Sequence, residues 1–523
     1  MAIPVIDLFA GPGGLGEGFA SLHTAGGRKR FLIRLAIESD PFAHQTLELR
    51  SFFREFPTGS IPQAYYEALK GQVSLAELFR SHPRAYEAAS RIAWNATLGV
   101  VPDDGVSTRI KSAVRASEAW VLLGGPPCQV YSLVGRSRVG GIRPNDRRLA
   151  LFKEYLKVLA RHRPAVFVLE NVKGLLSSNL RGDSILERLL HDLQYPAGVF
   201  ARRSHGVIHT RKEACYRLYS FVKSSVSGDL FGAQEFRPED FVIRSEEHGI
   251  PQARHRLIIL GVRDDLRTEH PRLLPRSEYA VSVADVIGSL PRVRSGLSRQ
   301  QDGPEDWKQT IRNARCSRWY LSAKNSGCRD VCDVISRVVD KLAVPRGDRG
   351  EEFVSCSGAV SYEHDWYHDE RLEGVCNHST RSHIPQDLHR YLFAACFAAV
   401  RGSSPVLRSF PIELLPDHRN IHQALTGSHF ADRFRVQVKS RPATTITSHI
   451  ARDGHYYIHY DPTQCRSLTV REAARIQTFP DNYFFCGPRT SQYIQVGNAV
   501  PPLLARQMAE LVFDLLRKAG LAG

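Results

Sequence analysis

The chain has 523 residues, of which 42% are hydrophobic and 24% charged, and 70 Lys and Arg against 54 Asp and Glu give a formal net charge of +16. These proportions are those of a globular protein and argue against a largely disordered chain, and no apolar run reaches the ~18–20 residues of a membrane span. The positive charge favours a polyanionic partner such as nucleic acid, although many basic proteins bind none. Ten Cys and no CxxC pair predict free thiols in a reducing, intracellular setting.

The first forty residues read as strand, glycine turn, helix and strand. Residues 5–9 form a short apolar strand, the turn 11–16 (GPGGLG) follows, and the apolar run 31–37 ends at Glu38. We expect no signal peptide before this first strand. Glycines allow a close backbone approach to a ligand, and an acid after the second strand can accept hydrogen bonds from ribose hydroxyls. The pattern indicates an adenosine-containing cofactor, with a purely structural glycine turn as the alternative.

Three further apolar runs border polar motifs. Residues 119–123 lead into GGPPC at 124–128, residues 165–169 lead into ENV at 170–172, and QARH at 252–255 precedes the run 256–261. Continuous apolar strands that alternate with helices predict an α/β fold with a parallel, doubly wound sheet. In such sheets the functional residues lie beyond the carboxyl ends of the strands.

The GGPPC turn presents a cysteine at a strand end. A Pro-Pro turn is stiff, so we expect Cys128 to be exposed and held in place, where nearby arginines or helix amides would favour the nucleophilic thiolate. A buried, inert thiol is the alternative, and the flanking glycines and prolines argue against it.

Glu170 and the arginines at 254 and 256 are the other candidates. An acid that ends a core strand is partly desolvated, which suits proton donation; a helix cap is the alternative. Arg254 and Arg256 stand at i and i+2, so they would share one face of a strand, where paired guanidiniums suit phosphate or base-edge contacts. Two surface arginines on a sheet edge are the alternative.

Taken together, these motifs resemble those of the DNA cytosine-5 methyltransferases. Residues 7–14 (DLFAGPGG) are similar to the family's first motif, and residues 125–129 (GPPCQ) to its nucleophile loop. The ENV and QARHR motifs follow in the family's order. Residues 466–480 (RSLTVREAARIQTFP) and 495–502 (QVGNAVPP) resemble the ninth and tenth motifs. The match begins at Ile6, ends at Ala505 and leaves most of residues 266–440 uncovered.

The resemblance implies covalent catalysis without a metal. By this analogy Cys128 attacks carbon 6 of cytosine, Glu170 hydrogen-bonds or protonates ring nitrogen 3, and carbon 5 takes a methyl group from S-adenosylmethionine. A base then removes the proton from carbon 5, and Cys128 leaves by β-elimination. Arg256 would contact the base oxygen, with Arg254 in support. The cofactor would be bound by Phe9, Gly11, Gly13, Gly14, Glu38, Pro127, Asn498 and Val500.

A cytosine inside a duplex cannot be methylated in the stack, so the resemblance also implies double-stranded DNA with a flipped-out base. The loop 130–148 carries five arginines against one Asp and suits a lid that contacts phosphates. The predicted DNA-binding residues are Arg136, Arg138, Arg143, Arg147 and Arg148. A solvated basic loop is the alternative. A second basic patch, more ambiguous, contains Arg202, Arg203, Arg211, Lys212 and Arg217.

The expected fold is therefore a doubly wound, Rossmann-like S-adenosylmethionine-dependent methyltransferase domain with a second, smaller target-recognition domain. Residues 1–274 would form the catalytic domain, with insertions at about 45–115 and 195–245. Residues 275–489 would form the target-recognition domain and hinge, and residues 490–523 would complete the catalytic domain.

Three other functions fit parts of the pattern. An RNA cytosine-5 methyltransferase would use the same apparatus, but the long region before the ninth motif favours readout of a duplex groove. A catalytically silent DNA-binding homologue is disfavoured by the intact Cys128, Glu170 and Arg256. A NAD-dependent oxidoreductase would explain the glycine turn and Glu38 but not the Pro-Pro-Cys turn.

Members of this family often protect host DNA beside a restriction nuclease. The resemblance therefore implies a restriction-modification or related defence setting, with a cognate nuclease or defence proteins as partners. We expect a monomer that has no membrane partner and a cytoplasmic, nucleoid-associated location. Five residues could provide zinc ligands, but their pairs lie far apart in the chain, and buried thiols with polar loop histidines are the simpler interpretation. They are Cys328, Cys332, Cys376, His378 and His383.

Overall fold

The computed structural model describes residues 2–57, 59–115, 117–126, 147–180, 183–201, 215–224, 236–358, 360–416, 421 and 432–522. Within these ranges, one sheet of eight strands has the order β3-β2-β1-β4-β5-β11-β8, and β9 also pairs with β11. Strands β1 to β5 run parallel, and β11 is antiparallel to β5, β8 and β9. The strands are β1 (Ile3–Leu8), β2 (Phe31–Glu38), β3 (Ala93–Asn95), β4 (Val121–Gly124), β5 (Val166–Val172), β8 (Tyr216–Tyr219), β9 (Val242–Arg244) and β11 (His255–Arg263).

Both faces of this sheet are covered by helices, which confirms the predicted doubly wound α/β fold. Successive side chains on a strand point to opposite faces, so Val5 and Leu123 lie in one core while Ile6 and Leu122 lie in the other. Because both cores are apolar, the strands read as continuous hydrophobic runs. Packed against the sheet are α1 (Gly14–Ala20) and α20 (Pro502–Lys518) on one face, and α6 (Asp103–Val114), α8 (Arg147–His162), α9 (Ile185–Gln194) and α10 (Pro196–Ala201) on the other.

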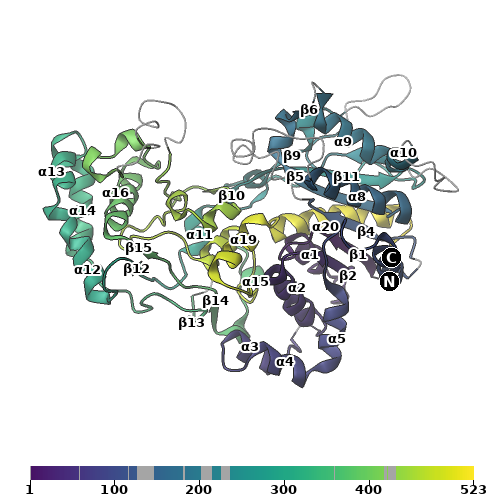
Figure 1. The fold of residues 1–523 in the computed structure, drawn as a ribbon, viewed down its shortest axis with the longest axis horizontal. Helices are drawn as coiled ribbons and strands as arrows, with labels where there is room; N and C mark the ends of the chain where they lie inside the picture. Colours follow the sequence, from purple (N-terminus) through teal and green to yellow (C-terminus); the bar gives the residue numbers. More distant parts are fainter. Residues whose placement is uncertain are drawn as a thin grey trace.

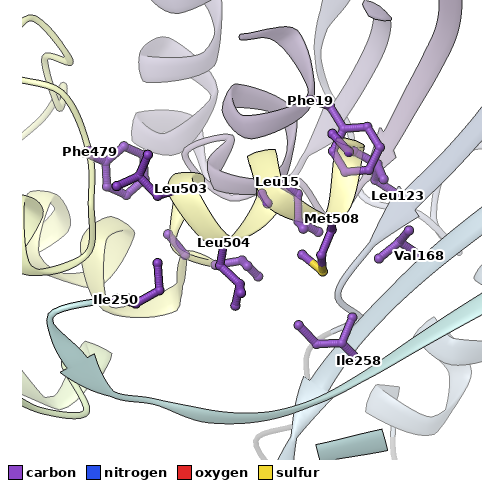
Figure 2. Close-up of a cluster of buried hydrophobic side chains, with 14 of the residues drawn as sticks. Leu15, Phe19, Leu123, Val168, Ile250, Ile258, Phe479, Leu503, Leu504 and Met508 are labelled. Atoms are coloured by element: carbon purple, nitrogen blue, oxygen red, sulfur yellow. The ribbon is translucent and has the colours of Figure 1, made fainter. Parts of the chain in front are cut away.

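The final helix, α20, belongs to the first of these cores. Figure 2 shows Met508 of α20 among Phe19 of α1, Val168 of β5 and Ile258 of β11. The chain reaches α20 through α18 (Val470–Ile476) and α19 (Arg489–Asn498). The C-terminal segment therefore completes the hydrophobic core that the N-terminal strands begin.

A second lobe has its own hydrophobic core, built around Trp307, Leu388 and Tyr391, and lies at the left of Figure 1. Its helices are α12 (Pro304–Arg312), α13 (Arg318–Asn325), α14 (Arg329–Asp340) and α16 (Pro385–Arg401). Outside the main sheet the chain also forms short strand pairs. They include β10 (Gln252–Ala253) with β16 (Ala443–Thr444), β12 (Gly296–Leu297) with β15 (Ser382–His383), and β13 (Phe353–Ser355) with β14 (Gly374–Cys376). The range expected for the recognition domain is thus divided, because Val283 and Phe479 lie in the core of the sheet domain.

The two expected insertions contain strands of the main sheet. Strand β3 and helix α6 fall within 45–115, and β8 and β9 fall within 195–245. These strands have only three or four residues, which is too few for a clear periodicity. A separate cluster packs α3 (Gln63–Leu69), α4 (Leu75–Ser81) and α5 (Pro83–Ile92) against α2 (Pro41–Arg54).

Apart from short 3-10 helices, the remaining described helices and strands are also short. They are β6 (Asn179–Leu180), β7 (Asp183–Ser184), α11 (Val283–Ile287) and α15 (His364–Tyr367). None of the helices in the described ranges combines the length and apolar character needed to cross a bilayer.

Candidate active site

The candidate polar motifs converge at one edge of the sheet. Strand β1 lies between β2 and β4, and β5 follows β4, all four parallel. Their carboxyl ends therefore meet, and each is followed by one of the motifs predicted from the sequence. This arrangement brings the glycine turn after β1, Glu38 at the end of β2 and Glu170 near the end of β5 to the same edge.

The glycine turn is tied to Glu38. The Gly11 amide donates to Glu38 Oε2 at 2.8 Å, and the amides of Ser39 and Asp40 donate to Oε1, each at 2.8 Å. The backbone φ angles of Phe9, Gly11 and Gly13 are all positive, at 56°, 57° and 95°. Glu38 is half-buried and its carboxylate has further lone pairs, so it can accept hydrogen bonds from a ligand as well.

The two sides of the turn differ in how much space they leave. A Cβ on Gly11 would meet no atom within 4 Å, whereas a Cβ on Gly14 would lie 2.3 Å from the carbonyl oxygen of Val500. Asn498 is exposed at the end of α19, two residues before Val500. Gly14 and Val500 are thus in direct contact beneath the turn, and the open side at Gly11 can admit a ligand.

A partly buried ion pair at this edge joins Glu170 and Arg256. Arg256 Nε lies 3.0 Å from Glu170 Oε1, and only 15% and 13% of the two side chains are exposed. Burial lowers the pKa of Arg256, and the Glu170 carboxylate opposes this shift. Glu170 Oε2 would also be 3.1 Å from a Cβ on Gly125. The acid therefore lies directly over the start of the Gly-Pro-Pro-Cys turn.

Arg254 has different partners from Arg256. The strand is interrupted at Arg254, between β10 and β11, and its side chain is buried. It donates to the carbonyl oxygens of Ile446 at 2.8 Å and Gly497 at 3.3 Å. Burial and the neighbouring Arg256 lower its pKa well below the usual range. Arg254 thus links the chain between β10 and β11 to the end of α19, next to Asn498.

Several predicted site residues lie outside the described residues. These are Pro127, Cys128, Arg136, Arg138 and Arg143, and in the second basic patch Arg202, Arg203, Arg211 and Lys212. Arg147 and Arg148 begin helix α8, and only their backbone is described. Arg217 donates to the carbonyl of Leu266 at 2.5 Å.

The structure adds a residue that sequence reasoning missed. Asn95 ends β3, and its side-chain amide donates to the carbonyl oxygens of Glu38 at 3.0 Å and Ser39 at 3.3 Å. Its side chain therefore contacts the backbone at the end of β2, at the edge where the other motifs meet. The only available signal was the short apolar run 92–94 followed by a polar residue, inside a stretch interpreted as an insertion.

The five Cys and His residues considered as zinc ligands are dispersed. Cys332 lies in the core of the second lobe, and Cys376 packs against α2 and α3. His378 contacts Thr469 Oγ1 at 3.0 Å and the Pro291 carbonyl at 2.8 Å. Among the described residues, no three His, Cys, Asp or Glu side chains are grouped as a metal site would require.

Comparisons with known proteins show which family the sequence matches. A family model described as C-5 cytosine-specific DNA methylase matches residues 97–196 and 233–514. The chain is 30% identical over 532 residues to the type II methyltransferase M.Bpa9945I of Bacillus paralicheniformis, which covers 98% of this chain and 99% of the relative. It is 26% identical over 541 residues to the type II methyltransferase M.AgeI of Thalassovita gelatinovora, which covers 97% and 98% of the two chains.

A solved structure supports the fold independently. The crystal structure of a protein encoded within an Escherichia coli prophage superposes with a TM-score of 0.52 at 16% identity, and the match covers 99% of this chain and 100% of that one. At this level of identity the likeness concerns the fold alone.

Proposed function

Because the chain belongs to the C-5 cytosine-specific DNA methylase family and is a DNA (cytosine-5-)-methyltransferase, we propose that it acts through a covalent adduct between Cys128 and a flipped-out cytosine. The observation that supports this mechanism best is the position of Glu170. Its carboxylate contacts Arg256 and lies over Gly125, three residues before Cys128. The acid on β5, the cation on β11 and the start of the nucleophile loop after β4 therefore lie close together.

The residues at the ends of β1 and β2 fit S-adenosylmethionine. Glu38 would accept hydrogen bonds from the ribose hydroxyls, and the open side of the turn at Gly11 would admit the ligand. Asn95, beside Glu38, is a further candidate for the adenosine part. When bound, this cofactor supplies an electrophilic methyl group. The full set that would hold it is Phe9, Gly11, Gly13, Gly14, Glu38, Asn95, Pro127, Asn498 and Val500.

The chain's own residues would activate the cytosine. The Cys128 thiolate forms a bond to carbon 6, and Glu170 hydrogen-bonds or protonates ring nitrogen 3, which stabilises the charge that develops. Carbon 5 would then act as an enamine carbon toward the methyl group of bound S-adenosylmethionine, whose sulfur–methyl bond would break with S-adenosylhomocysteine as the leaving group. A base removes the proton from carbon 5, and the bond between Cys128 and carbon 6 breaks by β-elimination, so the free thiolate is restored. Arg256 would contact the base oxygen and hold Glu170 in position.

We also propose double-stranded DNA as the substrate, bound between the sheet domain and the second lobe. The charge of +16 supports a polyanionic ligand, and a base must leave the stack for its carbon 5 to reach the site. The two relatives are named type II methyltransferases, which supports a restriction-modification setting with a partner nuclease.

The test is methyl transfer from labelled S-adenosylmethionine to unmethylated duplex DNA, single-stranded DNA and RNA. Label on carbon 5 of cytosine in duplex DNA, lost in Cys128→Ala, is the expected result. Cys316→Ala is the matched control, because Cys316 is an exposed thiol on the second lobe. Label only in RNA would contradict the substrate, and full activity of Cys128→Ala would contradict the covalent mechanism.

A further inference from the structure

The hydroxyl group of Tyr483, a residue far away in the sequence, contacts the glycine turn. The Tyr483 hydroxyl donates to the carbonyl oxygen of Pro12. A Cβ on Gly13 would be 3.1 Å from the same hydroxyl oxygen. Tyr483 is 1% exposed, and its own carbonyl accepts a hydrogen bond of 2.6 Å from Arg471. Tyr483 is therefore buried, its backbone is held by Arg471, and its hydroxyl contacts the turn at Pro12.

A second contact joins the same region through a buried arginine. The Arg50 guanidinium donates to Glu17 of α1 at 2.5 and 3.0 Å, and lies 4.9 Å from the centre of the Tyr483 ring. Its remaining nitrogen donates to Asn482 Oδ1 at 3.1 Å. Arg50 thus connects the helix that follows the glycine turn to Asn482 and Tyr483.

Asn482 is hydrogen-bonded to the segment that runs into the second lobe. Its side-chain amide donates to Asp369 Oδ2 at 2.7 Å, and the Tyr66 hydroxyl donates to the same oxygen at 3.0 Å. Asp369 begins a stretch that runs through β14 to α16 of the second lobe. Hydrogen bonds therefore connect α1 through Arg50 and Asn482 to Asp369, on the segment that leads to the second lobe. The neighbouring Tyr483 contacts Arg50 through its ring and the glycine turn through its hydroxyl.

We propose that Tyr483 and Asn482 are positioning residues: Tyr483 sets the conformation of the cofactor turn, and Asn482, through Asp369, couples this turn to the second lobe. The inference rests on the proposed function, since it takes the turn as the S-adenosylmethionine site and the second lobe as a DNA-contacting unit. A movement of the lobe on binding DNA would shift Asp369 and Asn482, and with them Arg50 and Tyr483. DNA and cofactor would then strengthen each other's binding, because such coupling is reciprocal.

The first arm of the test measures the binding of S-adenosylhomocysteine by calorimetry, without DNA. Tyr483→Phe removes only the hydroxyl and should raise the dissociation constant about five- to tenfold, the range expected for one lost buried hydrogen bond. At saturating cofactor its kcat should stay within twofold of wild type. Tyr493→Phe is the matched control, because that buried hydroxyl donates to the Leu468 carbonyl at 2.6 Å and does not touch the turn. Equal affinity in Tyr483→Phe and wild type would overturn the role of Tyr483.

The second arm repeats the titration with a duplex that carries the target site mapped in the methylation assay. In wild type the duplex should tighten S-adenosylhomocysteine binding by at least fivefold, and Asp369→Ala should bring this ratio close to one. Glu373→Ala is the control, because Glu373 lies on the same connection but pairs with Lys70 at 2.6 Å. No effect of DNA in wild type, or an unchanged ratio in Asp369→Ala, would overturn the coupling. If wild type transfers no methyl group, the proposed function fails instead, and the first arm still decides the role of Tyr483.

Discussion

Glu170 and Arg256 face each other across two antiparallel strands, with 3.0 Å between Oε1 and Nε. In the β5–β11 register, Glu170 is opposite Ile258 and Arg256 is opposite Val172, so the pair are diagonal neighbours on one face of the sheet. Both side chains are largely buried, and each supplies the countercharge of the other. A carboxyl group and a guanidinium are thereby held beside Gly125, at the start of the Gly-Pro-Pro-Cys turn. If the proposed mechanism holds, this arrangement preorganises charged groups for catalysis.

Glu170→Gln should lower kcat of methyl transfer by about 10²–10³-fold, because the amide keeps the shape of the acid but cannot give a proton to the ring nitrogen. Steady-state kinetics on duplex DNA would measure the loss. Glu246→Gln is the matched control, since Glu246 pairs at 2.7 Å with His255 of β11, the strand that also carries Arg256. A kcat within threefold of wild type in Glu170→Gln would contradict the assigned role.

Gly14→Ala should weaken cofactor binding and lower the melting temperature together. The new Cβ would lie 2.3 Å from the Val500 carbonyl oxygen. This oxygen and the Cα that carries the Cβ belong to the backbone, so the clash is relieved only if α1 separates from the C-terminal segment. Gly105→Ala, in the open first turn of α6, has no atom within 4 Å of its Cβ and should be neutral or slightly stabilising. Calorimetry would measure the dissociation constant of the cofactor, and thermal unfolding the melting temperature, in both variants. Equal values in Gly14→Ala and Gly105→Ala would refute the close-contact argument.

Arg254→Ala should lower the free energy of unfolding by about 3 kcal/mol, because the buried carbonyls of Ile446 and Gly497 would lose a charged donor. Urea denaturation would measure this, with Arg337→Ala on the exposed face of α14 as control. An unchanged unfolding curve combined with lost methyl transfer would instead make Arg254 a direct contact of the reacting base.

The free energy of unfolding should fall as the pH decreases from about 6.5 to about 4. Burial lowers the pKa of His378 from 6.5 to about 4, in spite of the nearby Glu472, so in this window the unfolded chain binds the proton that the folded chain excludes. His459 behaves alike, with a pKa lowered by burial to about 4. His378→Gln should therefore show a shallower dependence on pH than wild type, measured by urea denaturation at pH 7, 6 and 5. If the free energy of unfolding changes with pH equally in His378→Gln and wild type, His378 does not contribute to the pH dependence.

The sequence signals that indicate the candidate site are local. A glycine turn after an apolar strand, Glu38 after the next, and Glu170 after a third can each be recognised within about ten residues, since strand ends carry polar residues where the core stops. Parallel pairing then brings these ends together whatever the intervening sequence. Strand β3 escaped this reasoning because three residues show no periodicity, and Asn95 was missed with it.

The sequence by itself therefore determined the family, the α/β fold and the residue types at the strand ends. Only the tertiary structure decided which partner each side chain meets: Arg256 pairs with Glu170, whereas Arg254, two residues earlier, binds the carbonyls of Ile446 and Gly497. The Tyr483 contact with Pro12 joins residues 471 positions apart. Such pairings follow from the packing of α20 and the C-terminal segment against the sheet, and no local pattern encodes them because their energy arises only when distant surfaces are buried together.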